Sequence, residues 1–270
     1  MRVLGVDPAS GKKGSACFGP SGNDDEADGA LGVDLGVGPV KLAKRLGKFH
    51  GLVTWDAPLT GPADPESSEL NEHDLTMREI ESVWMKFTGW DGKRKKKRVP
   101  GVSVLPYSGL SHWVVTRRIL GLPLVGEFDK TPSRELIFER PKKPGRYVVE
   151  THPTLALWIW QRRRFKDYKS KKVKAEMRRR RAHGLWTALL NQLNVGELYP
   201  AALATSSRSL RSMTDDELDA RVGWLLGRLW LDGKAGVEMV GNERTGGFLL
   251  PVEGLKAEEL KALRARGVAV

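Results

Sequence analysis

The first eighteen residues constrain the fold most, because they indicate a buried strand, an acidic residue at its end, a glycine-rich turn and a second strand. Val3, Leu4 and Val6 are typical of a strand covered on both faces, and Gly11 marks the turn that follows. Asp7, at the end of such a strand, is expected to be half exposed, so it can stay charged, hold a metal ion or orient the amides of the turn. A residue that caps its own turn explains this segment equally well.

The charge balance indicates an acidic partner. The chain has 45 Lys and Arg residues against 33 Asp and Glu, a formal net charge of +12 and a pI near 9.8. Nucleic acid is the first partner that such a protein fits, and an anionic membrane is the second. The 270 residues, 40% of them hydrophobic, suffice for one large or two small domains with a substantial core.

The sequence contains one cysteine and no segment that resembles a membrane span. The single cysteine, Cys17, excludes an intramolecular disulfide framework and a zinc site built mainly from thiolates, and it fits a reducing compartment. No apolar run approaches the roughly 20 residues of a membrane span, and the first residues lack the order of a signal peptide. We therefore expect a cytoplasmic protein that does not use a membrane, while the oligomeric state stays open.

The order of the predicted elements is typical of a mixed sheet flanked by helices. Strands are expected near residues 3–6, 15–18, 30–34, 52–55 and 146–150. Helices are expected from Pro39, over 69–87, after Ser111, after Pro153, over 169–193 and from a capping box at Thr214. We predict a single α/β domain over 1–270 with a five-stranded sheet, an insertion at 60–110, a peripheral segment at 241–251 and a peripheral C-terminal helix within 252–270.

Carboxylates end three of the predicted strands. If the strands of Asp7, Asp56 and Glu150 lie side by side in one sheet, these acids converge at one edge. Asp216 and Asp219 lie three residues apart on one side of the capped helix. Converging carboxylates repel one another unless a cation neutralises them, so the pattern predicts Mg²⁺ or Mn²⁺, which prefer oxygen ligands. Two such ions can activate a water and stabilise the leaving oxygen in phosphodiester hydrolysis.

Each of these residues also has a purely structural interpretation. Asp56 can begin a turn, Glu150 can pair with an arginine, and Asp216 lies in a first helical turn, where the helix dipole favours acids whatever the function. Asp219 lies beyond the capping positions of its helix, so a capping role does not explain it. The occurrence of all these acids together favours a metal site. His152 can be a ligand, a proton donor or a loop residue held by a hydrogen bond, of which the last is the commonest.

Two basic tracts are predicted to contact phosphate. The first is a run of six like charges, which without a partner is normally solvated or disordered: Lys93, Arg94, Lys95, Lys96, Lys97 and Arg98. The candidates in the second tract are Lys171, Lys172, Arg178 and Arg179. A solvated face is the alternative for any charge run, but here the lack of balancing acids favours nucleic acid.

These segments resemble known families. Gly5–Ser10, followed by Gly14, is similar to the opening of RuvC-type junction resolvases and their ribonuclease H-like relatives. The chain more closely resembles the uncharacterised family numbered 429 among domains of unknown function, which is regarded as a family of predicted nucleases. The segments that carry this resemblance are Asp56–Leu59, the helix with Asp74 and Arg78, Val149–Pro153, the basic helix ending at Leu189 and Leu190, Asp216–Ala220 and Gly246–Pro251. The resemblance implies a ribonuclease H-like sheet flanked by helices, with Asp7, Asp56, Glu150 and the helix of Asp216 and Asp219 at one site.

Three functions remain in competition. The first is a metal-dependent nuclease acting on DNA or RNA, and the second is a nucleic-acid-binding protein of the same fold whose carboxylates are structural. The third is a phosphotransferase of the actin and sugar-kinase type, which also opens with a strand, an aspartate and a glycine turn. The sequence has no second glycine-rich phosphate loop after Asp56 or near Asp219, which disfavours this third class.

Overall fold

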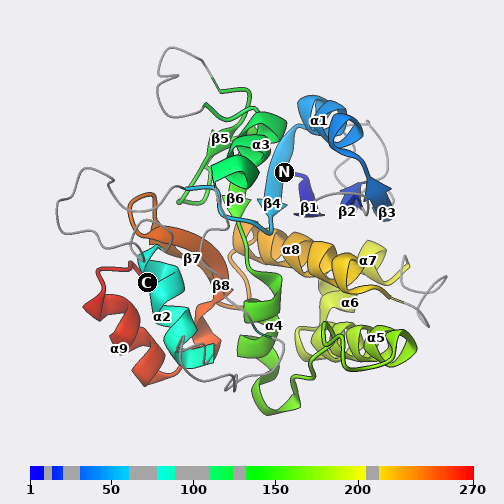
Figure 1. Ribbon diagram of the computed structural model, residues 1–270, viewed down its shortest axis with the longest axis vertical. Coiled ribbons are helices and arrows are strands. Elements are labelled where there is room, and N and C mark those ends of the chain that lie inside the picture. The colour runs from blue at the N-terminus through cyan, green and yellow to red at the C-terminus, as the bar shows by residue number, and fades with distance from the viewer. Residues whose placement is uncertain are drawn as a thin grey trace.

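The computed structural model describes residues 1–8, 14–20, 31–60, 78–88, 102, 110–123, 132–204 and 213–270. Within these ranges the chain forms a mixed α/β fold with a six-stranded sheet in the order β3-β2-β1-β4-β6-β5 (Figure 1). The strands are β1 (Val3–Asp7), β2 (Ser15–Pro20), β3 (Leu31–Val37), β4 (Gly51–Trp55), β5 (Glu135–Leu136) and β6 (Arg146–Glu150). Strands β1, β4, β6 and β5 run parallel, whereas β2 is antiparallel to both β1 and β3.

The sheet differs from the prediction by one strand. All five expected strands form, and β5 adds a two-residue edge strand that pairs with β6. Two residues are too few to leave an alternating pattern in a sequence. A separate hairpin of β7 (Val237–Asn242) and β8 (Gly246–Pro251) forms near the C-terminus. Because every residue of β8 is buried, the prediction that 241–251 is peripheral is wrong.

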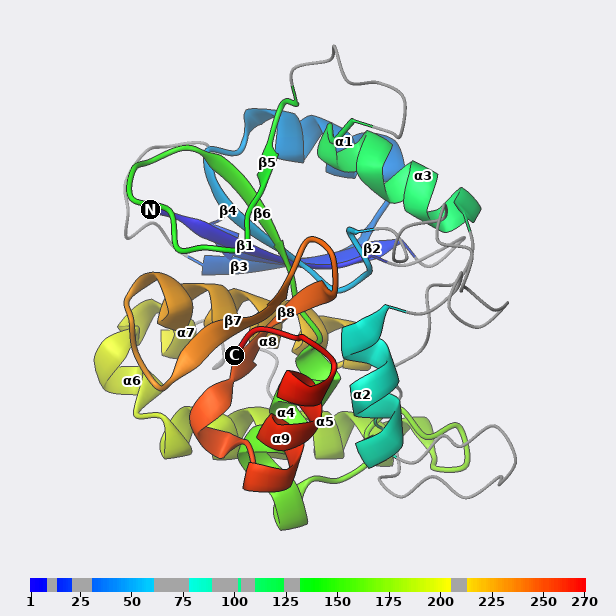
Figure 2. The same ribbon diagram turned by 90° about the vertical axis from the view of Figure 1, so that its left-hand side faces the viewer.

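Helices cover both faces of the sheet (Figure 2). On one face lie α1 (Pro39–Lys48) and α3 (Leu110–Leu120), and against the other lies α8 (Asp215–Leu231). Beyond α8 lie α4 (Pro153–Gln161) and α5 (Ala175–Gln192), while α2 (Glu79–Thr88) and α9 (Ala257–Ala265) flank the hairpin. Two short helices, α6 (Val195–Leu198) and α7 (Pro200–Ala204), follow α5. No helix of the described ranges is long and apolar enough to cross a membrane.

Alternating side chains divide the core into two layers. Leu4 and Val6 belong to the layer beneath α1, whereas Val3 belongs to the layer shared with α8. The same alternation places Val148 in the first layer and Val149 in the second. Successive residues of a strand point to opposite faces of the sheet. The face of a residue at a strand end therefore follows from whether it lies an even or an odd number of positions from these neighbours.

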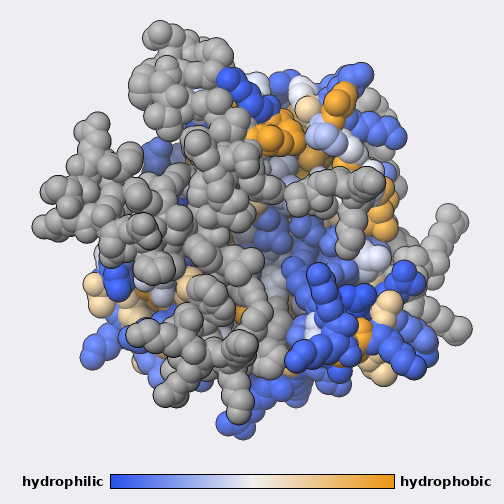
Figure 3. Space-filling view, viewed as in Figure 1, coloured by the Kyte–Doolittle hydropathy of each residue, from blue (hydrophilic) through white to orange (hydrophobic). Residues whose placement is uncertain are grey.

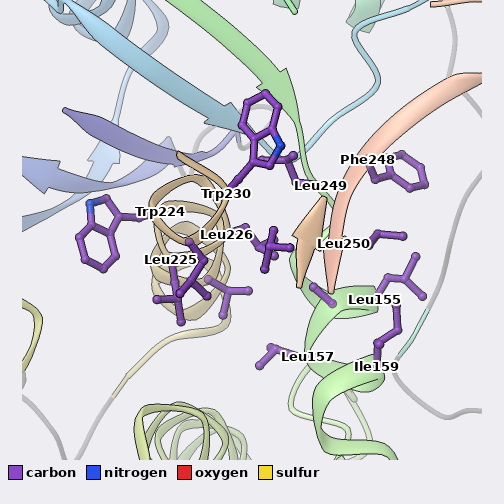
Figure 4. Packing of buried hydrophobic residues seen from close by; sticks show 14 of the residues in the cluster. Leu155, Leu157, Ile159, Trp224, Leu225, Leu226, Trp230, Phe248, Leu249 and Leu250 are labelled. Atoms are coloured by element: carbon purple, nitrogen blue, oxygen red, sulfur yellow. The ribbon is translucent and has the colours of Figure 1, made fainter. Parts of the chain in front are cut away.

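Helix α8 lies close to the sheet because both surfaces have glycines at the contact. A Cβ atom on Gly5 would lie 2.0 Å from the carbonyl oxygen of Ala220, and one on Gly223 would lie 3.1 Å from Oγ1 of Thr54. The remaining faces of α8 pack against β8 and α4 through apolar side chains such as Leu226 (Figure 4). This close approach brings the first turns of α8 to the ends of β1 and β4.

The helix boundaries follow local signals. Pro39 begins α1, and Oγ1 of Thr214 accepts a hydrogen bond of 3.0 Å from the amide of Glu217 at the start of α8, as the capping box predicts. Gly233, with φ of +64°, follows the end of α8. The basic helix is shorter than predicted, since α5 begins at Ala175 and residues 169–174 precede it as a turn.

Candidate functional site

Three carboxylates come together where the sheet meets α8. Asp7 ends β1 and lies four residues after Val3, so its side chain is on the same face of the sheet as that of Val3, which is the face toward α8. Asp56 follows β4, and its amide donates a 3.1 Å hydrogen bond to the carbonyl oxygen of Val6, so the β1–β4 ladder continues to this residue. Asp219 projects from α8 with 1% of its surface exposed. The structure therefore brings these three acids into one neighbourhood, in which each acts on the charge of another.

The electrostatics of the three carboxylates are those of a crowded acidic site. Burial, with the charges of Asp219 and Asp56, raises the pKa of Asp7 well above its ordinary value, although Lys169 opposes the shift. Burial and the charge of Asp219 raise the pKa of Asp56 to about 7, again against Lys169. Asp216, on the same turn of α8, adds a smaller repulsion at Asp7. The fold thus holds negative charge here at an electrostatic cost that a cation relieves.

Tyr168 and Lys169 contact the innermost carboxylate. The hydroxyl of Tyr168 donates to Oδ1 of Asp219 at 2.5 Å and also lies 3.0 Å from Oγ1 of Thr154. Nζ of Lys169 forms an ion pair with Oδ2 of Asp219, also at 2.5 Å. Burial alone would lower the pKa of Lys169, but Asp219, Tyr168 and the two strand-end aspartates raise it well above its ordinary value. Among the residues that the structure describes, Lys169 is therefore the cation that pairs with Asp219.

Glu150 has a different partner. Arg78 donates to both of its oxygens, at 2.6 Å to Oε2 and 2.5 Å to Oε1, and the amide of Leu59 donates to Oε2 at 2.9 Å. Arg78 also bonds Glu81 and the hydroxyl of Thr60, and its side chain is fully buried. Burial raises the pKa of Glu150 despite these donors. The arginine pairing considered for Glu150 from the sequence is thus the arrangement that forms.

Strand register places Glu150 on the opposite face of the sheet from Asp7, although its charge still contributes to the raised pKa of Asp56. Glu150 is in register with Trp55, which is in register with Val6. The three side chains therefore point to the face of the sheet that lies beneath α1. The residue aligned with Asp56 is instead Thr151, whose amide donates to the carbonyl oxygen of Trp55 at 2.9 Å. Asp7 and Glu150 consequently belong to opposite faces, and a metal site that includes both, as predicted, is not what this geometry forms.

Sequence reasoning missed three residues of this neighbourhood. Tyr168 carried no signal, and Lys169 stood out in the sequence only as part of the second basic tract, because only the tertiary fold brings the segment before α5 to Asp219. Thr151 had a signal in its position after the strand-end acid, and its buried Oγ1 has no hydrogen-bond partner among the described residues. His152 caps α4, accepting from the amide of Leu155 at 3.3 Å, and its ring contacts Phe248 edge-on. The commonest interpretation of His152 is thus the one observed.

A basic surface adjoins the carboxylates. Residues 162–181, which we call the basic segment, contain twelve Lys and Arg residues and two acids. Lys171, Lys172 and Arg179 are exposed and Arg178 is partly exposed, and Figure 3 shows hydrophilic side chains over the α5 end of the molecule. Lys169 belongs to this segment and links it to Asp219. The first basic tract, 93–98, and Asp74 lie outside the described residues.

The site fits a divalent cation by its chemistry. Asp7, Asp56 and Asp219 supply carboxylate oxygens, the ligands that Mg²⁺ and Mn²⁺ prefer, and their mutual repulsion is what a cation relieves. In the described ranges no three His, Cys, Asp or Glu residues are arranged to hold a metal ion, so the fit rests on the chemistry of the carboxylates and not on their positions. Lys169 supplies the neutralising charge instead.

Comparison with known proteins connects part of this site to a family. No curated protein and no solved structure matches the chain, so the ribonuclease H-like comparison stays a prediction. A family model described as "Protein of unknown function (DUF429)" matches residues 128–244, a segment that contains Glu150, Lys169 and Asp219 but neither Asp7 nor Asp56. Over residues 128–244, the chain is therefore similar to the DUF429 family of proteins of unknown function.

Proposed function

We propose that this protein is a metal-dependent nuclease that hydrolyses phosphodiester bonds of DNA or RNA. The observation that carries the proposal is the meeting of Asp7, Asp56 and Asp219 beside a segment with a large excess of positive charge. Acids grouped in this way, with Asp219 buried and Asp7 and Asp56 partly buried, have little structural use, since each raises the electrostatic cost of the others. A strongly basic surface next to them is typical of proteins that bring a phosphate backbone to an acidic centre.

The residues have separable roles in this proposal. Asp7, Asp56 and Asp219 would hold Mg²⁺ or Mn²⁺, which when bound supplies Lewis acidity and an activated water. Tyr168 orients Asp219 through its 2.5 Å hydrogen bond. The exposed Lys171, Lys172 and Arg179 bind the backbone of the nucleic acid and orient it along the basic segment. Glu150, with Arg78, holds the end of β6 and the residues after β4 in place.

A second candidate is a nucleic-acid-binding protein without catalytic activity. The observation in its favour is that Lys169 already neutralises Asp219, so that the acids have a structural partner and need no metal. The two functions share the basic surface and differ only in cleavage. A phosphotransferase has no comparable support, because the described residues around Asp56 and Asp219 add no phosphate-binding glycine turn; measuring ATP turnover with small-molecule acceptors tests it.

The deciding experiment is a cleavage panel with labelled single-stranded, duplex and branched DNA and RNA in Mg²⁺, Mn²⁺ or chelator. Asp7→Asn should abolish cleavage and leave binding intact or slightly tighter, because it removes a negative charge that faces phosphate. Asp34→Asn, the same change at an exposed residue of β3, is the matched control and should cleave normally. Full cleavage by Asp7→Asn would overturn the proposed site, and binding without cleavage in every metal would favour the second candidate.

A further inference from the structure

We propose that Lys169 occupies the cation position of the carboxylate site in the metal-free protein, and that a divalent cation binds by displacing its ammonium group. The inference deepens the proposed nuclease function and rests on it, since it presumes that the site takes a metal. It assigns to Lys169 a competitive, regulatory role at the site, distinct from the phosphate contacts proposed for the rest of the basic segment.

The contacts of Asp219 carry the inference. Its Oδ2 atom is 2.5 Å from Nζ of Lys169, and its Oδ1 atom accepts the hydrogen bond of Tyr168 at the same distance. Both oxygens of a carboxylate that is 1% exposed are therefore engaged. A metal ion can reach Asp219 only by replacing one of these partners, and the positively charged partner is the one whose electrostatic role the ion takes over.

The two partners differ in how easily they leave. Tyr168 is 1% exposed, belongs to the buried core and also contacts Thr154 through its hydroxyl, so withdrawing its ring would break core packing. The side chain of Lys169 is 38% exposed, and the residue lies in the non-helical segment between Arg162–Arg164, a short 3-10 helix, and α5. A flexible four-carbon stem lets the ammonium move outward without displacement of the backbone.

The contrast with Glu150 supports the same assignment. Arg78, the partner of Glu150, is fully buried and donates through a rigid planar fork to Glu150, Glu81 and Thr60. Withdrawing this guanidinium would leave two buried carboxylates without their donors. Of Lys169 and Arg78, the partners of Asp219 and Glu150, Lys169 is therefore the one that a metal ion can replace.

The experiment measures thermal unfolding of the full chain against Mn²⁺ concentration. Lys169→Met keeps the length of the stem and removes the competing charge, so its Mn²⁺ midpoint should fall at least about tenfold below that of the wild type. Lys169→Arg, which can bind Asp219 through two nitrogens, should raise the midpoint or leave it unchanged. Lys166→Met, the same charge change at an exposed residue of the basic segment, is the matched control and should keep the wild-type midpoint.

The outcomes separate this inference from the proposed function. In chelator, Lys169→Met should melt at a lower temperature than the wild type, and Mn²⁺ should restore its melting temperature. If Lys169→Met does not fold, Lys169→Gln is used in its place. Equal Mn²⁺ midpoints in the wild type, Lys169→Met and Lys166→Met would overturn the competition and leave the metal site standing. No response to Mn²⁺ in any variant, the wild type included, would overturn the metal site and the proposed nuclease with it.

Discussion

The guanidinium of Arg78 donates two hydrogen bonds to the carboxylate of Glu150, at 2.5 and 2.6 Å, in the interior of the protein. Arg78 lies immediately before α2, and Glu150 is the last residue of β6. The pair joins the segment that precedes α2 to the sheet, and the amide of Leu59 joins the residues after β4 to the same carboxylate at 2.9 Å. Glu150 thus acts as a structural junction beside the site that Asp7, Asp56 and Asp219 form.

Removing the arginine of this junction should strongly destabilise the protein. Arg78→Met leaves Glu150 and Glu81 buried without their counter-charge, which should lower the free energy of unfolding by about 3–5 kcal/mol. Arg45→Met, which breaks an ion pair with the exposed Asp34, should cost at most about 1 kcal/mol. Urea denaturation of the two variants and the wild type measures both values, and equal losses would contradict a structural role of the buried pair.

The placement of Glu150 on the opposite face from Asp7 predicts a difference in metal response. Glu150→Gln should lower stability, because it weakens the bonds to Arg78, yet it should keep the Mn²⁺-dependent rise in melting temperature. Asp7→Asn should lose most of that rise, since it removes a carboxylate from the metal site itself. Thermal unfolding with and without Mn²⁺ distinguishes the two variants. Loss of the Mn²⁺ response in Glu150→Gln would indicate that Glu150 is a metal ligand.

The pKa of Asp56 predicts how stability depends on pH in chelator. Burial and the charge of Asp219 raise this pKa from 3.8 to about 7 in the folded protein, so the folded state binds the proton more tightly than the unfolded state. The resulting stabilisation is complete below 3.8 and is lost as the pH rises through about 7.

The wild type should therefore melt a few degrees lower at about pH 8 than at about pH 5. Asp56→Asn should remove part of this difference, because its amide does not titrate, and Mn²⁺ should restore the wild type at the higher pH. Melting curves of both proteins across this range check the sign. The prediction would be contradicted if the melting temperature of the wild type rose with pH more than the melting temperature of Asp56→Asn.

The basic segment should determine the salt dependence of nucleic-acid binding. Replacing the exposed Lys171, Lys172 and Arg179 by Gln should reduce the slope of log affinity against log salt by about 0.9 for each side chain that contacts a duplex phosphate. Replacing Lys41, Lys44 and Lys48 of α1, on the other face of the sheet, changes the net charge equally and should leave the slope nearly unchanged. Titrations at several salt concentrations measure both, and equal slopes in the two triple variants would remove the segment from the interface.

The close contact of α8 with the sheet should make Gly5 intolerant of any side chain. The Cβ atom of Gly5→Ala would lie 2.0 Å from a backbone oxygen of α8, so the helix must shift, at a cost of about 1–3 kcal/mol or more. Gly184→Ala, in an exposed position of α5 with no atom within 4 Å, should instead stabilise the helix by up to about 1 kcal/mol. Denaturation measures both changes, and a neutral Gly5→Ala would show that α8 moves freely.

Local signals in the sequence predicted much of the fold. The apolar strands that carry Asp7 and Asp56, the proline that begins α1 and the capping box of α8 each depend on residues a few positions apart, and all of them form as expected. The predicted neighbourhood of Asp7, Asp56 and Asp219 followed from these elements, because parallel strands that end together bring their last residues to one edge. The two-residue strand β5 and the buried β8 lacked such a signal.

The sequence by itself determined which acids end strands, which segment is basic and where the helices begin, since these properties depend on short-range patterns. Only the tertiary structure decided which acid receives which cation. Register placed Glu150 on the opposite face from Asp7, and there the long side chain of Arg78, 72 residues away in the chain, reaches it. The contact between Lys169 and Asp219 spans 50 residues and forms because the segment before α5 crosses the first turns of α8. Such pairings depend on the packing of whole elements, and no local pattern encodes them.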